Sequence, residues 1–185
     1  MRLKSILLCA LGLYLFSANQ VAVAEQPQNP CALPSDLHDE ITKKYPGTHL
    51  VTLADLDEYN RKLFRKDHGG RCPGLVKVDF YGDRKPTWAL LLIPGEGSNR
   101  KAELVVARQL GRGWEISSLD TVDASEVPVI WRQGPGKYDD ISEPKTIRAA
   151  NPVIVICGYE VWARLYAWTG KKWRRLNSPT REPLR

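Results

Sequence analysis

The sequence has few of the residues, and none of the short motifs, from which the common catalytic sites are built. It contains three histidines and four cysteines in 185 residues. No HExxH, CxxC, GxSxG or glycine-rich phosphate loop is present, although these motifs supply most familiar metal, redox, acyl-transfer and nucleotide chemistry. His38, His49 and His68 are too far apart in the chain to predict a metal site. We therefore expect no metal and no cofactor, and we disfavour an enzyme.

Long apolar segments are also missing after residue 24. No later run approaches the roughly 18 apolar residues that a membrane-spanning helix needs. At the N-terminus, two basic residues precede a short apolar stretch (6–16), and Ala22-Val23-Ala24 offers the small residues that signal peptidase requires. The sequence thus predicts a signal peptide over residues 1–24 and a periplasmic or secreted protein. An uncleaved anchor is the alternative.

The charge balance is only mildly basic. Lysine and arginine total 27 against 21 acidic residues, a formal net charge of +6. This excess favours weak attraction to anionic envelope polymers and does not require a nucleic-acid partner. Because an exported protein does not meet the nucleic acids of the cell, we expect none.

Hydrophobic patterning predicts helices first and strands afterwards. A polar, proline-bearing tether (25–34) precedes two helical patterns, which begin after Ser35 and Thr52. From Leu75 onward, short apolar or alternating segments are joined by glycine-containing turns. We expect one α+β domain over residues 35–178, with the two N-terminal helices packed on an antiparallel β-meander of about seven strands, followed by a basic tail (179–185).

Some details of this domain are also predicted. Trp88, Trp114 and Trp131 are expected in the core, and residues 133–144, which contain glycine, proline and several acids, are expected to form a loop.

Three cysteines follow the predicted signal peptide. Cys31 and Cys72 lie in proline- and glycine-containing loop sequences, whereas Cys157 ends a run of β-branched residues typical of a buried strand. An oxidising compartment permits a disulfide bond. We expect a Cys31–Cys72 disulfide, with Cys157 as a small core residue.

The segment DFYGDRKPTWALLL (79–92) contains two aspartates around a turn. It resembles the DFNGDGKPDYALLL-type hairpin of many exported bacterial proteins, which is related to the calcium loops of FG-GAP and dockerin-like repeats. The resemblance implies a hairpin and makes Asp79 and Asp83 candidate calcium ligands. Tyr81 replaces an expected oxygen ligand and Arg84 replaces a glycine. The alternative is a β-turn whose carboxylates accept hydrogen bonds.

One face of a C-terminal strand combines large aromatic and basic residues. At period two, residues 161–168 present small apolar side chains on one face and a mixed set on the other. The candidate binding residues on this face and on the next strand are Trp162, Arg164, Tyr166, Trp168, Lys172, Arg174 and Arg175. Tryptophan, tyrosine and arginine dominate protein-binding hot spots. The alternative is that the N-terminal helices cover this face.

These observations lead to three hypotheses. The first is an exported non-catalytic binding protein that engages another protein in the envelope or outside the cell, as an inhibitor or immunity protein does. The second is a binder of envelope glycan or another anionic polymer, which would use the same face by stacking and charge. The third is a small secreted hydrolase with a site assembled from scattered acids and histidines.

Overall fold

The computed structural model describes residues 29–95, 101–159 and 161–178. The predicted signal peptide (1–24), the start of the tether and the basic tail (179–185) lie outside the described residues. The elements in chain order are α1 (Ser35–Lys44), β1 (Thr48–Leu50), α2 (Glu58–His68), β2 (Leu75–Val78), β3 (Thr87–Pro94), β4 (Lys101–Leu110), β5 (Gly113–Asp123), β6 (Val129–Gln133), β7 (Gly136–Asp139), β8 (Thr146–Ala149), β9 (Val153–Gly158), β10 (Trp162–Trp168) and β11 (Trp173–Ser178).

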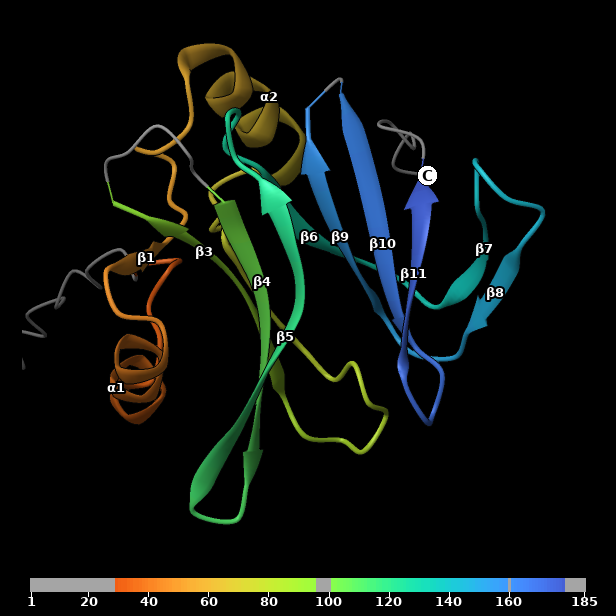
Figure 1. The fold of residues 1–185 in the computed structure, drawn as a ribbon, viewed down its shortest axis with the longest axis horizontal. Helices are drawn as coiled ribbons and strands as arrows, with labels where there is room; N and C mark the ends of the chain where they lie inside the picture. The colour runs from red at the N-terminus through yellow and green to blue at the C-terminus, as the bar shows by residue number, and fades with distance from the viewer. Residues whose placement is uncertain (1–28, 96–100, 160, 179–185) are drawn as a thin grey trace, which may run out of the picture.

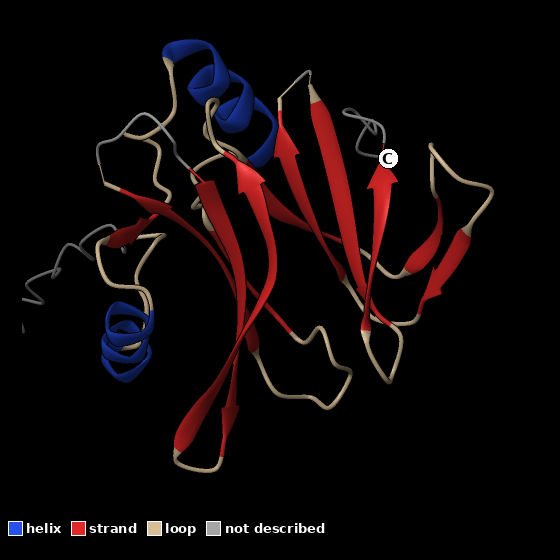
Figure 2. Cartoon of the chain, viewed as in Figure 1, coloured by secondary structure: helices blue, strands red, loops and turns tan. Residues whose placement is uncertain are grey.

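The strands form three antiparallel sheets. The five-stranded sheet has the order β1-β3-β4-β5, and β2 also pairs with β3. The four-stranded sheet has the order β11-β10-β9-β6, and β7 and β8 form a separate hairpin. The two larger sheets lie side by side and diverge toward one end (Figure 1). Figure 2 shows how far strand outweighs helix in the chain.

The main core lies between the two larger sheets. Leu91 and Leu104 from the five-stranded sheet share it with Ile130 and Ile156 from the four-stranded sheet. A second cluster lies on the other face of β3 and β4, where Leu37 and the rest of the buried stripe of α1 pack. β3 is therefore covered on both faces, which explains why nearly all of its residues are buried.

A third cluster lies on the outer face of the four-stranded sheet. Val155 and Leu165 pack there against Ile147 of the β7–β8 hairpin. The hairpin thus shields apolar side chains that would otherwise face water.

The expectation of two helices packed on one seven-stranded meander is wrong. The chain is mostly β, and its helices are short and do not form a layer together: α1 packs on the outer face of β3 and β4, while α2 contributes Phe64 to the core between the sheets. The predicted strands divide into two sheets because β6 pairs with β9 rather than with β5. Strand periodicity indicates which residues are buried but does not say which sheet covers them.

Two local expectations also change. Residues 133–144 contain β7, which pairs with β8, rather than only a loop. The second helix begins at Glu58, where Asp57 caps it by accepting the backbone N–H of Asn60 at 2.9 Å, and not after Thr52. Neither described helix has the length and apolar character needed to cross a membrane.

Candidate functional site

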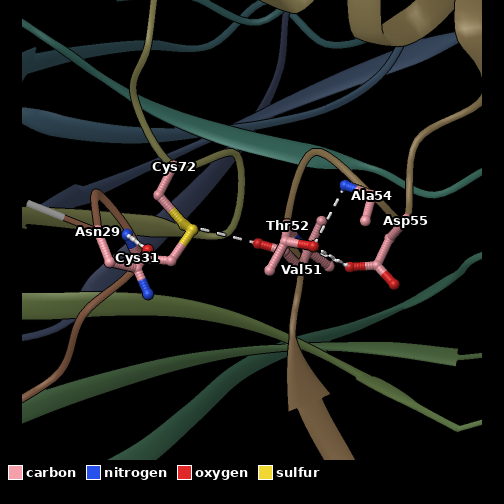
Figure 3. Close-up of a disulfide and its surroundings, with 7 residues drawn as sticks. All are labelled: Asn29, Cys31, Val51, Thr52, Ala54, Asp55 and Cys72. Carbon is pink, nitrogen blue, oxygen red and sulfur yellow. Dashed lines mark hydrogen bonds between the residues drawn. A yellow bond between two sulfur atoms is a disulfide. The ribbon is translucent and has the colours of Figure 1, made fainter. Parts of the chain in front are cut away.

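The predicted disulfide between Cys31 and Cys72 is confirmed. It joins the segment before α1 to the loop after α2, with a Cα–Cα distance of 5.0 Å (Figure 3). The Sγ of Cys72 lies 3.6 Å from the carbonyl oxygen of Val51. Cys157 is fully buried and outside any disulfide, and burial raises the pKa of its thiol to about 12.

The structure divides the seven candidate binding residues among three places. The side chains of Trp162, Arg164, Tyr166, Trp168 and Arg175 lie on the face of β10 and β11 that is turned toward the five-stranded sheet. Arg174 lies on the opposite face, since it follows the alternation between Trp173 and Arg175, and Lys172 lies in the β10–β11 turn. Both are exposed.

Within this face, Tyr166 is buried and three side chains are only partly exposed. Tyr166 is 2 % exposed and belongs to the main core, while Trp162, Arg164 and Trp168 are half-buried. The neighbours of this face include Asp120 of β5 and Tyr81 of the 79–86 loop, and α2 contributes Phe64 to the same core cluster.

Asp120 of β5 is the centre of the polar contacts on this face. Its Oδ2 accepts hydrogen bonds from the Tyr166 hydroxyl and, at 2.7 Å, from Nη1 of Arg164. Nη1 of Arg175 lies 3.8 Å from the same oxygen. Burial first, and then the hydrogen bond to Asp120, raises the pKa of Tyr166. These groups tie the two large sheets together.

An aromatic cluster formed by Tyr81, Trp168 and Trp173 lies on the same face of β10 and β11. The centre of the Tyr81 ring lies 4.7 Å from the centre of the Trp168 ring and 5.6 Å from that of the Trp173 ring. The guanidinium carbon of Arg108 lies 4.6 Å from the centre of the Tyr81 ring. Trp168 of the predicted face and Trp173 therefore contact Tyr81 of the 79–86 loop and stabilise the junction between the sheets.

The loop that resembles a calcium-binding hairpin uses its carboxylates within the protein. Asp79 accepts the backbone N–H groups of Gly82, Asp83 and Arg84 at 2.7–3.2 Å. Asp83 accepts the N–H of Lys85 and pairs with Arg108. This arrangement corresponds to the β-turn alternative. Among the described residues, no group of three or more His, Cys, Asp or Glu side chains is placed to hold a metal ion.

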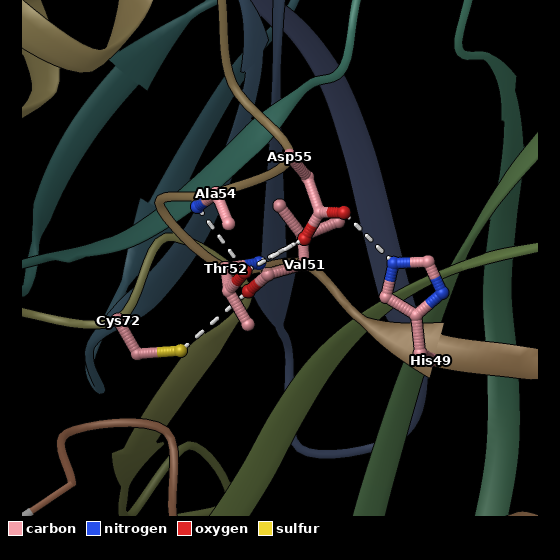
Figure 4. Close-up of polar contacts among 6 residues, drawn as sticks. All are labelled: His49, Val51, Thr52, Ala54, Asp55 and Cys72. Atoms are coloured by element: carbon pink, nitrogen blue, oxygen red, sulfur yellow. Dashed lines mark hydrogen bonds and ion pairs between the residues drawn. The ribbon is translucent and has the colours of Figure 1, made fainter. Parts of the chain in front are cut away.

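His38 and His49 each lie within 4 Å of an aspartate carboxylate. His38 is exposed and lies 3.6 Å from Asp39. Nε2 of His49 lies 2.9 Å from Oδ1 of Asp55, whose Oδ2 accepts the N–H and the hydroxyl of Thr52 (Figure 4). Although burial raises the pKa of Asp55, the hydrogen bonds from His49 and Thr52 lower it overall. The aspartate lies between the other two groups, so His49 is not in place to deprotonate Thr52.

A pocket of about 620 Å³ lies beside the disulfide. Four separate parts of the chain line it: the segment before α1, the C-terminal end of α2 with the following loop, β2 with β3, and β6. Its described lining residues are Asn29, Pro30, Ala32, Phe64, His68, Arg71, Cys72, Leu75, Val76, Lys77, Trp88, Ile130, Trp131 and Arg132. The volume falls within the range of about 300–1,000 Å³ that is usual for ligand sites.

The pocket combines aromatic rings with positive charge. The centre of the His68 ring lies 4.8 Å from the centre of the Phe64 ring and 5.0 Å from that of the Trp131 ring. Nζ of Lys77 lies 4.4 Å from the centre of the Trp88 ring. None of the described lining residues is acidic.

The sequence provides no local signal for this pocket. Its four basic groups belong to α2, the loop after it, β2 and β6, and nothing in the spacing of His68, Arg71, Lys77 and Arg132 relates them. Trp88, expected in the core, is buried but reaches the pocket, and Trp131 is only half-buried. The disulfide that the sequence did predict, Cys31–Cys72, lies at the edge of this pocket.

In comparisons with family models, curated proteins and solved structures, none matched this chain. The functional argument therefore depends on the chemistry of the chain's own residues.

Proposed function

We propose that the protein is a non-catalytic binding protein of the periplasm or the extracellular space, which engages another protein as an inhibitor or immunity protein does. One observation carries the proposal: the pocket beside the disulfide combines a concave aromatic floor with a basic rim. Aromatic and arginine side chains contribute most to affinity when they line such a concave, partly desolvated site. We place the contact with the partner at this pocket.

The non-catalytic part of the proposal is supported by how the reactive groups are held. The thiol of Cys157 is buried, and its pKa of about 12 keeps it protonated at neutral pH. Asp55 already accepts hydrogen bonds from Thr52 and contacts His49. Each group thus has a structural role that accounts for its position.

The compartment is supported by the disulfide. Such bonds persist in oxidising environments and are rare in the bacterial cytosol. The Cys31–Cys72 bond closes a loop with a sequence separation of 41, and a loop of that length contributes substantially to stability.

The test is a capture experiment with matched charge reversals. Immobilised protein is exposed to periplasmic and secreted extracts as wild type, as Arg71→Glu/Arg132→Glu, and as Arg112→Glu/Lys171→Glu. Arg112 and Lys171 are exposed, lie in the β4–β5 and β10–β11 turns, and are not pocket residues. The two double variants have the same net charge, so a difference between them reports position rather than total charge.

We expect one protein to be retained by the wild type and the turn variant and lost by the pocket variant. Equal retention by all three proteins contradicts pocket binding. Capture of glycan or another anionic polymer instead, weakened equally in both variants and steeply by salt, would favour the second hypothesis over a protein partner.

A further inference from the structure

The floor of the pocket is built to contact an aromatic ring. Phe64 and Ile130 are buried, and the half-buried Trp131 stacks on His68 at 5.0 Å. Burial is the largest effect on the His68 imidazole and lowers its pKa. At neutral pH the ring is therefore uncharged and fits an apolar surface, while its nitrogens remain able to form a hydrogen bond.

Arg71, Arg132 and Lys77 give the rim of the pocket positive charge. Arg71 and Arg132 are exposed, and among the described residues neither guanidinium forms a hydrogen bond or an ion pair. Lys77 is exposed, and its ammonium lies above the Trp88 ring rather than beside an acid. Two arginines away from the pocket do have acidic partners: Asp83 pairs with Arg108 and Asp120 with Arg164. The pocket cations are therefore available to a carboxylate that a partner supplies.

We infer that the pocket receives a segment of the partner protein in which an aromatic side chain stands beside a carboxylate. The aromatic ring enters between Trp131 and the apolar floor, and the carboxylate pairs with Arg71 and Arg132. Guanidinium groups bind carboxylates through paired hydrogen bonds, which gives orientation as well as affinity. This inference rests on the proposed function, because it names the chemistry of the partner at the same pocket.

The test uses capped tripeptides as probes. Acetyl-Glu-Trp-Glu-amide is compared with acetyl-Gln-Trp-Gln-amide, which removes the charge, and with acetyl-Glu-Ala-Glu-amide, which removes the ring. Affinities are measured by NMR titration of the full chain. We expect each change to weaken binding about tenfold, the loss typical of one charge-assisted hydrogen bond or one stacked ring.

Matched variants localise the effect. Arg71→Gln/Arg132→Gln should abolish the difference between the Glu and Gln peptides, whereas Arg112→Gln/Lys171→Gln should preserve it. Trp131→Leu should abolish the difference between the Trp and Ala peptides. Equal affinity for the three peptides overturns the inference even if the capture experiment finds a partner at the pocket, so the two failures are distinguishable. Free indole-3-acetate is tested as a small-molecule competitor. If it binds tenfold or more tightly than the Glu-Trp-Glu peptide, the pocket is a site for a small aromatic acid, and the inference that it receives a segment of a protein is overturned.

Discussion

Asp120 of β5 and Arg164 of β10 join the two large sheets through a contact of 2.7 Å between Oδ2 and Nη1. The Tyr166 hydroxyl donates to the same carboxylate. Only 14 % of the Asp120 side chain is exposed, so its removal leaves Arg164 half-buried without its acid. We predict that Asp120→Ala lowers the free energy of unfolding by about 2–4 kcal/mol, measured by urea denaturation. Glu115→Ala, at an exposed position of the same strand, is the matched control and should change it little.

Tyr166→Phe separates the hydroxyl from the ring at the same site. The variant keeps the buried ring in the main core and removes only the donor to Asp120. The expected loss is about 1–2 kcal/mol, less than for Asp120→Ala because the ion pair with Arg164 remains. A loss as large as that of Asp120→Ala would contradict the view that the carboxylate is the centre of this network.

The Cys31–Cys72 bond is expected to affect both stability and the pocket. Replacing both cysteines with serine should lower the free energy of unfolding by about 4 kcal/mol in the chain-entropy model. The disulfide ties the segment Asn29–Ala32 to the loop after α2. Because this segment lines the pocket, affinity for the Glu-Trp-Glu peptide should also fall in protein that circular dichroism shows to be folded. Unchanged affinity would show that the segment Asn29–Ala32 is not needed for peptide binding.

Gly74 lies too close to another backbone segment to accept a side chain. A Cβ at this position would stand 2.4 Å from the carbonyl oxygen of Val51. We predict that Gly74→Ala lowers the melting temperature, with a cost of about 1–3 kcal/mol. Gly70→Ala is the control, since a Cβ there meets nothing within 4 Å. Equal melting temperatures for the two variants would refute the close approach.

Asp140 anchors the segment after β7 to β11. The Ser142 N–H and hydroxyl, together with the N–H of Asn177, hold the pKa of Asp140 at about 2, below the usual 3.8. A carboxyl whose pKa is lowered by folding stabilises the folded state above its unfolded pKa, and the contribution is lost as the pH falls through the folded value. We predict that Asp140→Asn is less stable than the wild type at pH 7 and that the difference narrows between about pH 4 and 2. A difference independent of pH would contradict the assigned cause.

Much of the local structure could be predicted from the sequence, but the arrangement of the sheets could not. Spacing of Leu37 and Ile41 predicts the buried stripe of α1, and the apolar run 88–93 predicts a strand buried on both faces. Alternation in β10 correctly assigns Leu165 and Ala167 to one face. The face with Arg164, however, is turned toward β5, and only the register of long-range pairing decides this.

The candidate sites differ in the same way. The Cys31–Cys72 pairing followed from loop chemistry around two residues, which is local information. The pocket depends on His68, Arg132 and other residues that the fold brings together from four parts of the chain. No periodicity relates such residues, so a single sequence does not predict their convergence.

The most direct measurement is a map of the indole N–H signals when the Glu-Trp-Glu peptide is added to ¹⁵N-labelled protein. The chain has six tryptophans, and those that line the pocket are distinct from the neighbouring pair Trp168 and Trp173. We predict shifts at Trp88 and Trp131, which line the pocket, and no change at Trp162 or Trp168. Shifts at Trp162 and Trp168 with Trp88 and Trp131 unchanged would contradict the account and return the binding site to the inner face of β10.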